Sequence, residues 1–297
     1  MSHINESNTK KITVPHIRSR KGGSPIVALT AYDYPSARLV DEAGFDFILV
    51  GDSLAQTVLG YDSTLPVTLE EMIAATKAVR RATRRALIVG DMPFGYYQDN
   101  IDHAVGAAIR FVKEGGAEAV KLEGGARRAQ AVKAIVEAEV PVMGHIGLTP
   151  QSVLRMGGYR VQGKSIEAAK ELLEDALALE RAGVFAMVLE AIPREISRLI
   201  TERVSVPTIG IGAGAECDGQ ILVFTDLVGL TFGHKAKFVR QYADVKSVIT
   251  DALKQYADDV TARRFPADQE SYHLPEGVVV EIQEEQSESM PPLGPIN

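Results

Sequence analysis

Residues 42–50 read EAGFDFILV, and the chain repeats this pattern as EGGAEAVKL at 114–122 and as RAGVFAMVL at 181–189. In each segment we expect a helix to end at the glycine and a short, mainly apolar strand to follow it. Glycine is common after the last turn of a helix because it adopts positive φ without steric cost. Strands that are apolar along most of their length are typical of parallel sheets covered by helices. The three segments therefore predict units in which helices and parallel strands alternate.

Five further segments of the chain have a similar apolar strand pattern, so that eight strands are predicted in all. They are expected near Ile26–Thr30, Phe47–Gly51, Leu87–Asp91, Ala119–Leu122, Val142–His145, Ala186–Glu190, Thr208–Ile211 and Leu227–Leu230. Helical patterns lie between the strands, among them one that starts at a capping-box pair, Thr68 with Glu71, one from Ile166 to Gly183, and one near 243–263. Eight such units predict the α/β class and a single (β/α)8 TIM barrel. A doubly wound open sheet stays an alternative, because strand spacing alone fits both folds.

Composition divides the chain into three expected parts. We expect an N-terminal extension at 1–23, the barrel catalytic domain at 24–264, and a disordered or loosely attached acidic tail at 265–297. The tail has seven acidic residues and no Lys or Arg, whereas the remaining chain carries 32 acidic and 32 basic residues. The net charge of −7 therefore resides in the tail, and the body lacks the basic surplus that a nucleic-acid-binding face requires.

The location expected for the protein is the cytoplasm. Cys217 is the only cysteine, so no disulfide can form within one chain, and a reducing compartment fits this composition. No apolar run approaches the length needed to cross a membrane. The polar residues 1–10 lack the apolar region of a signal peptide. We therefore expect neither nucleic-acid nor membrane partners.

Three acidic residues stand at the ends of consecutive predicted strands, namely Asp52, Asp91 and Glu123. In a barrel these strand ends meet at one mouth, where barrel enzymes hold their active sites. Three carboxylates that lie close together repel one another unless a cation neutralises them. Oxygen ligands suit Mg²⁺, whereas Zn²⁺ is less expected because no Cys/His ligand spacing is present. The alternative is that each acid only caps the helix that follows it.

Two basic residues are expected at the same mouth. Lys121 shares one face of its strand with Glu123, so it could bind a substrate carboxylate or change the pKa of a neighbour. A salt bridge to Glu123 or Asp91 is the alternative for this lysine. His145 could donate a hydrogen bond to a substrate oxygen, or it could be a buried structural histidine.

Glu190 ends a strand in an apolar sequence, MVLEAIP. Burial there would raise the pKa of Glu190 towards neutrality, as a base that removes a carbon-bound proton requires. The alternative is an acid at the start of a helix before Pro193. A metal, a lysine and a separate base together suit proton abstraction beside a carbonyl group. The glycine-rich run Gly210–Gly214 could bind an anion through its backbone, or it could be only a tight turn.

An ordered set of motifs resembles the ketopantoate hydroxymethyltransferase family over about residues 24–263. The matching strings are TAYDYPSA (30–37), LVGDSLAQTVLGYDSTLPVT (49–68), DMPF (91–94), VKLEGG (120–125), GHIGLTPQS (144–152), GGYRVQGKS (157–165), LEAIP (189–193) and GIGAG followed by CDGQILV (217–223). The chain departs from the family pattern at Ala55-Gln56, where Gly-Met is expected. These two residues carry no assigned role.

The resemblance implies roles for five residues of the mouth. Asp52 and Asp91 match the direct Mg²⁺ ligands, with one ion per subunit, and Glu123 matches the third acid, which binds directly or through water. Ser53 and Lys121, together with Asp52 and Asp91, match the residues that hold the 2-oxo acid substrate.

The resemblance also implies the reaction. Glu190 matches the proton acceptor at C3 of 3-methyl-2-oxobutanoate, and we expect His145 to support it. The Mg-stabilised enolate would take a one-carbon unit from 5,10-methylenetetrahydrofolate and give 2-dehydropantoate (ketopantoate) for pantothenate biosynthesis. The family is cytoplasmic and forms homo-oligomers, typically homodecamers. Two alternatives stay open: a related metal-dependent barrel enzyme of the phosphoenolpyruvate mutase/isocitrate lyase type, and a barrel without catalytic activity.

Overall fold

The structure is a computed structural model that describes residues 10–233, 235–275 and 277–278. The chain divides into two units, residues 1–244 and residues 245–297. The first unit contains the barrel. The division into extension, barrel and tail that the sequence suggests stays a prediction.

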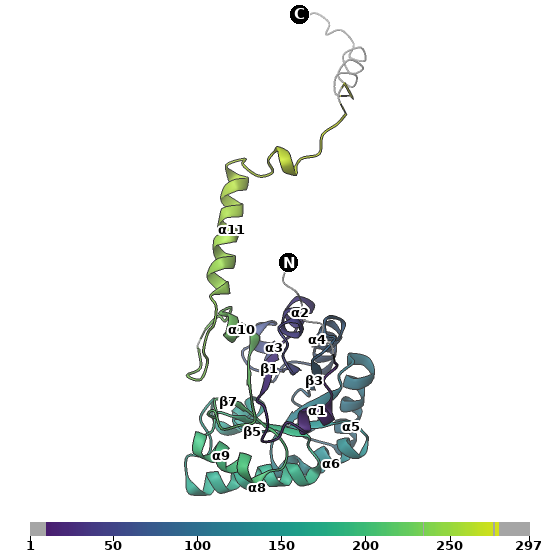
Figure 1. The fold of residues 1–297 in the computed structure, drawn as a ribbon, viewed down its shortest axis with the longest axis vertical. Coiled ribbons are helices and arrows are strands. Elements are labelled where there is room, and N and C mark those ends of the chain that lie inside the picture. The colour runs from purple at the N-terminus through teal and green to yellow at the C-terminus, as the bar shows by residue number, and fades with distance from the viewer. Residues whose placement is uncertain (1–9, 234, 276, 279–297) are drawn as a thin grey trace, which may run out of the picture. The chain divides into compact units, whose positions relative to one another are not determined.

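Eight parallel strands form a closed barrel in sequence order, and β1 pairs with β8 to complete it (Figure 1). The strands are β1 Ile26–Thr30, β2 Phe47–Val50, β3 Leu87–Asp91, β4 Ala119–Glu123, β5 Val142–Gly147, β6 Ala186–Glu190, β7 Thr208–Ile211 and β8 Gly219–Leu222. This closure confirms the predicted TIM barrel and excludes the open sheet.

Helices cover the outside of the barrel (Figure 1). In chain order the α-helices described in the first unit are α1 Val14–Arg18, α2 Tyr34–Glu42, α3 Leu54–Thr57, α4 Leu69–Ala82, α5 Ile101–Arg110, α6 Ala129–Glu137, α7 Val153–Met156, α8 Ile166–Ala182, α9 Arg194–Arg203 and α10 Phe224–Val228. The predicted capping box is present before α4, where Thr68 and Glu71 exchange hydrogen bonds. Gly183 ends α8 at φ 100°, as the helix-to-strand pattern predicts.

The buried core has two layers, separated by the strands. Outward-facing strand residues such as Ile88 and Leu122 belong to one buried cluster together with helix residues such as Met72 and Leu179. Inward-facing residues form a second cluster, made of Ile26, Ala28, Phe47, Leu49, Leu87, Val89, Ala119, Met143, Ala186, Val188, Ile209 and Ile221. This second layer fills the inside of the barrel.

The segment before β1 closes the N-terminal end of the barrel. Ile12 and Ile17 are buried members of the inner cluster. The Ile12 N–H donates to Arg85 O at 2.8 Å, just before β3, and Lys11 Nζ pairs with Glu118 Oε2 just before β4. The opposite end of the barrel, at the C-terminal ends of the strands, is not covered by this segment.

The predicted eighth strand at Leu227–Leu230 is wrong. Residues 224–228 form helix α10, which ends at Gly229 with φ 72°, and the strand is β8, Gly219–Leu222. A Cβ atom on Gly219 would lie 2.5 Å from Ile26 O, so β8 can approach β1 only because glycine stands there. Gly219 and Gln220 interrupt the apolar pattern of this strand, whereas the apolar run LVGL resembles a buried strand.

The second unit contains helix α11, Val245–Thr261, where the sequence predicts a helix near 243–263. Within this unit the rings of Tyr256 and Phe265 meet edge to face at 5.4 Å. Most of the acidic tail, 279–297, lies outside the described residues, so its expected disorder stays a prediction. Among the helices in the described ranges, none is long and apolar enough to cross a membrane.

Candidate active site

The ionisable residues of the site continue the inward-facing rows of the strands. Side chains alternate along a strand, so Leu87 and Val89 share a face with Asp91, and Ala119 shares a face with Lys121 and Glu123. The inner face is therefore apolar towards the N-terminal end and charged where the strands finish. His145 on β5 and Glu190 on β6 follow the same alternation.

A cavity of about 650 Å³ opens at this charged end. Its lining contains every predicted site residue: Asp52, Ser53, Asp91, Lys121, Glu123, His145 and Glu190. Apolar side chains, among them Val188, Ile211 and Ile221, form the remaining wall beside the charged groups. The structure thus brings together all seven residues that the sequence places at the mouth.

Lys121 and Asp91 form a buried ion pair. Lys121 Nζ lies 2.7 Å from Asp91 Oδ1 and 2.8 Å from Oδ2. Burial alone would lower the pKa of Lys121, but the charges of Asp91, Glu123 and Asp52 outweigh burial and raise it. The lysine is therefore held as a cation, in the salt bridge that the sequence left as an alternative.

Asp52 lies beside this pair at the end of β2. Its backbone N–H donates to Asp91 Oδ2 at 3.1 Å, and its own Oδ2 accepts a hydrogen bond from Gln151 at 2.8 Å. Burial, with the charges of Asp91 and Glu123, raises the pKa of Asp52 well above its ordinary value. Ionised Asp52 therefore needs further positive charge nearby.

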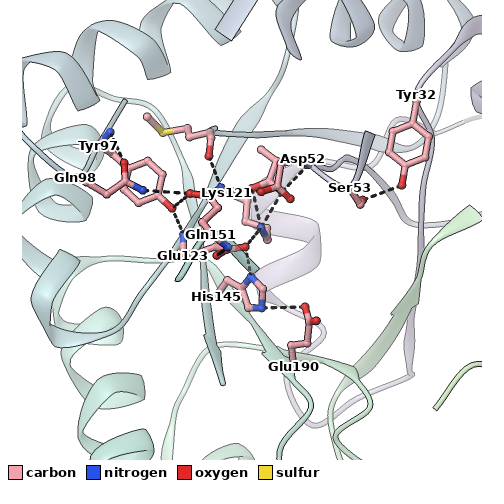
Figure 2. A network of polar contacts seen from close by, with 12 residues as sticks. Tyr32, Asp52, Ser53, Tyr97, Gln98, Lys121, Glu123, His145, Gln151 and Glu190 are labelled. Carbon is pink, nitrogen blue, oxygen red and sulfur yellow. Dashed lines mark hydrogen bonds and ion pairs between the residues drawn. The ribbon is translucent and has the colours of Figure 1, made fainter. Parts of the chain in front are cut away.

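His145 lies between two acids. Its Nδ1 is 3.5 Å from Glu123 Oε1, and its Nε2 is 3.2 Å from Glu190 Oε2 (Figure 2). Burial and Lys121 lower the pKa of His145, but Glu123 and Glu190 outweigh them and raise it to about 9. Glu190 thus has a cationic neighbour, in addition to the apolar residues that surround it in the sequence.

The donor atoms of the site fit a Mg²⁺ ion that takes part of its coordination from water or substrate. At the strand ends four carboxylates lie around two cations, Lys121 and His145, so this part of the cavity carries excess negative charge. The cavity lining also includes Asp226, Arg160 and Lys237, which leaves the acids in excess by one. Glu123 Oε1 is buried and has no hydrogen-bond partner among the described residues. In the same ranges no three His, Cys, Asp or Glu side chains converge closely enough to hold a metal alone. Mg²⁺ commonly binds one or two protein carboxylates and completes six ligands with water or substrate oxygens.

The backbone beside Glu190 is unusual. Ala191, the next residue, has φ 46°, a left-handed conformation that non-glycine residues rarely adopt. Across from it, a Cβ atom on Gly147 would lie 2.2 Å from Glu190 O. The ends of β5 and β6 therefore meet closely at the proposed base, and such strain is common at functional sites.

Sequence reasoning missed the uncharged polar residues that contact the acids. Gln151 bonds to Asp52, and Tyr97 bonds to both Gln151 and Glu123. Ser53 Oγ lies 2.8 Å from Tyr32 Oη, a second tyrosine without a predicted role. Gln151 lies in the motif GLTPQS, and Tyr97 lies three residues after DMPF. Their positions in or beside family motifs were the signal in the sequence that could have indicated a role.

Comparison with known proteins identifies the family. The family model described as ketopantoate hydroxymethyltransferase matches residues 11–268. The chain belongs to the ketopantoate hydroxymethyltransferase family. It is therefore an enzyme, a transferase of pantothenate biosynthesis.

Two relatives show how much of the chain this family likeness covers. The 3-methyl-2-oxobutanoate hydroxymethyltransferase of Koribacter versatilis (strain Ellin345) is 59% identical over 266 residues, which are 89% of this chain and 90% of that protein. The protein of the same name from Thermoanaerobacter sp. (strain X514) is 56% identical over 255 residues, covering 86% and 93%. The match to the family model, residues 11–268, spans all eight strands of the barrel.

Solved structures with low identity share the fold. 2,3-dimethylmalate lyase, a member of the PEP mutase/isocitrate lyase superfamily, has a TM-score of 0.57 and 18% identity, covering 93% of this chain and 98% of the lyase. A phosphonopyruvate hydrolase in complex with oxalate and Mg²⁺ has a TM-score of 0.56 and 13% identity, covering 93% and 96%. These likenesses show the barrel architecture alone, so family membership decides between the two enzyme types that the sequence left open.

Proposed function

We propose that the chain transfers a hydroxymethyl group from 5,10-methylenetetrahydrofolate to 3-methyl-2-oxobutanoate and releases 2-dehydropantoate. The observation that carries the proposal is the arrangement of the mouth. A cluster of acids with one lysine lies at the ends of β2, β3 and β4, and a separate acid, Glu190, lies at the end of β6. Enolate formation needs two separate groups: one holds the keto and carboxylate oxygens of the 2-oxo acid, and the other removes the proton from the neighbouring carbon.

The acid cluster would hold one Mg²⁺ ion per subunit. We assign Asp52 and Asp91 as ligands, with Glu123 binding directly or through water. When bound, Mg²⁺ would polarise the keto group and stabilise the negative charge that develops on its oxygen. The raised pKa of Asp52 supports this assignment, because it marks a carboxylate that still needs positive charge.

The 2-oxo acid would lie against Asp52, Ser53, Asp91 and Lys121. Lys121 is a buried cation that lines the cavity, so it can attract a substrate carboxylate or a developing oxyanion. Ser53 Oγ faces the same cavity and can donate a hydrogen bond. The apolar wall of Val188, Ile211 and Ile221 suits the branched hydrocarbon end of the substrate.

Glu190 would remove the C3 proton. The proton moves to the Glu190 carboxylate, and C3 forms a bond to the methylene carbon of the donor. Both bonds from that carbon to N5 and N10 of the donor break, and these two nitrogens take up the proton removed from C3 and one proton of water. Water supplies the hydroxyl oxygen, so that tetrahydrofolate and 2-dehydropantoate are the products. His145, 3.2 Å from Glu190 Oε2, would orient the base and support it electrostatically.

Deuterium exchange at C3 tests the proposal in two stages. 3-Methyl-2-oxobutanoate is incubated with the enzyme in D₂O, with and without Mg²⁺, and followed by NMR; methylenetetrahydrofolate is then added. We expect exchange only with Mg²⁺, followed by ketopantoate after the donor is added. If the enzyme gives no exchange and forms no ketopantoate, the proposal is contradicted.

The Glu190→Gln variant identifies the base. It should bind Mg²⁺ and the 2-oxo acid but lose about 10²–10⁴-fold in exchange rate, which is the usual contribution of a positioned base. Glu195→Gln, on α9, is the matched control and should exchange at the normal rate. Normal exchange in Glu190→Gln would remove Glu190 from the role of base.

We also propose a cytoplasmic homodecamer. This proposal comes from the family resemblance, and light scattering of the purified protein tests it. The expected mass is ten times the 32.1 kDa of one chain. A smaller or mixed assembly would contradict the expected number of subunits.

A further inference from the structure

Gln151 is a buried glutamine whose side-chain amide is fully hydrogen-bonded. It lies in the short 3-10 turn Pro150–Ser152 that follows β5. Its Nε2 donates to Asp52 Oδ2 at 2.8 Å and to Met92 O at 3.0 Å. Its Oε1 accepts from the Tyr97 hydroxyl and from Gln98 Nε2, the latter at 3.1 Å (Figure 2). Two donors and two acceptor positions are thus all in use.

These partners determine which way the amide points. Met92 O can only accept a hydrogen bond, so Nε2 rather than Oε1 must face it. The same nitrogen therefore faces Asp52, and Gln151 donates to this carboxylate. The amide oxygen is directed at Tyr97 and Gln98, which makes Gln151 unsuited to bind a metal ion itself.

Gln151 also contacts the third acid through its backbone. The Gln151 N–H donates to Glu123 Oε2 at 3.0 Å. Tyr97, which is 2% exposed, completes the connection, because its Oη accepts the Glu123 N–H at 3.1 Å while it donates to Gln151. One glutamine and one tyrosine therefore fix two acids at the ends of different strands.

Each contact uses one oxygen of a carboxylate. Gln151 takes Oδ2 of Asp52 and Oε2 of Glu123. Glu123 Oε1 makes no hydrogen bond among the described residues and has only the longer ion-pair contacts with His145 at 3.5 Å and Lys121 at 3.9 Å. A neutral donor can hold a carboxylate in this way without adding a charge that would compete with a cation. Hydrogen bonds to the ionised form also favour that form, which a metal requires.

We infer that Gln151, oriented by Tyr97, is a positioning residue that holds the carboxylates of Asp52 and Glu123 ready for Mg²⁺. This inference rests on the proposed function, because that proposal makes these acids the metal ligands. Partners of this kind orient metal ligands in many proteins, and their loss costs about 10–100-fold in metal affinity.

The test is Mg²⁺ titration by calorimetry on the full chain without substrate. Tyr97→Phe removes a single oxygen and keeps the ring, and Gln151→Met keeps the side-chain length but removes the amide. We expect both variants to bind Mg²⁺ about 10–100-fold more weakly than the wild type. Tyr61→Phe is the matched control, because the Tyr61 hydroxyl bonds to Glu71 at an exposed position, and its Mg²⁺ affinity should be unchanged.

The Mg²⁺ dependence of C3 exchange separates positioning from structural damage. A variant that only misplaces the ligands should need more Mg²⁺ and should regain most of the exchange rate at saturating Mg²⁺. Unchanged Mg²⁺ affinity in Tyr97→Phe would overturn the inference, whatever happens to Gln151→Met. A wild-type protein without saturable Mg²⁺ binding would instead contradict the metal site of the proposed function.

Discussion

Lys121→Met removes the one lysine of the cavity's acid cluster and keeps a side chain of similar length. In the structure the Lys121 side chain is 5% exposed and its Nζ lies 2.7 Å from Asp91 Oδ1, with Glu123 Oε1 at 3.9 Å. The variant would leave Asp91, Asp52 and Glu123 close together without the lysine that balances them. We expect the metal-free protein to be strongly destabilised.

The size of the effect follows from the buried pair. At the observed 2.7 Å and an effective dielectric constant of about 20, the attraction between Lys121 and Asp91 is about 6 kcal/mol. Desolvation of both groups opposes this attraction, so the expected loss in the free energy of unfolding is about 3–5 kcal/mol, as for other broken buried pairs.

The loss should depend on pH, because carboxylates left without a cation can be neutralised by protons. Lys121 remains charged in the wild type throughout the neutral range, since its pKa is raised. In the variant the acids repel one another most when all are ionised. The destabilisation should therefore be larger at pH 8 than at pH 5.

Urea unfolding in EDTA at both pH values measures this loss. Lys133→Met is the matched control, because Lys133 forms an exposed pair with Glu137 at 3.6 Å and its removal should change nothing measurable. A loss below about 1 kcal/mol at pH 8, the level of a surface pair, would refute the electrostatic reasoning. An equal loss at pH 5 and pH 8 would refute the role of carboxylate repulsion.

Three further predictions concern the metal, the histidine and the tail. Asp91→Asn should weaken Mg²⁺ binding in calorimetry by about tenfold or more, since a ligand charge is lost; unchanged affinity would remove Asp91 from the ligand set. His145 has a raised pKa of about 9, so its ion pairs should stabilise the fold fully below its ordinary pKa of about 6.5 and lose this effect as the pH rises through about 9. The wild type should therefore lose its stability advantage over His145→Gln across that window in EDTA, and a constant difference would argue against a charged His145. Deleting 265–297 should leave turnover nearly intact, and a large loss of activity would show that the tail helps to order the mouth or the assembly.

Much of the site was predictable because strands alternate strictly. Asp91, Lys121, Glu123 and Glu190 each stand at or near the end of an apolar strand, and a parallel barrel brings such ends together. Once the eight units are counted, a period of two residues places these side chains on the inner face. The wrong eighth strand did not affect this prediction, because no assigned residue lies on it.

The sequence by itself determined the alternation of strands and helices, the caps of α4 and α8, and the side of each strand that carries charge. These features depend on neighbouring residues, whose backbone preferences and periodicity are local. Only the tertiary structure decided that Gly219 lets β8 close against β1 and that Ile12 and Ile17 fill the N-terminal end of the barrel. It likewise decided that His145 lies between Glu123 and Glu190. It also decided that Gln151 meets Asp52, 99 positions away, through an amide whose direction Tyr97 and Met92 impose. Such contacts form only when the barrel closes, because closure, and not local sequence, sets the distances between side chains from different strands.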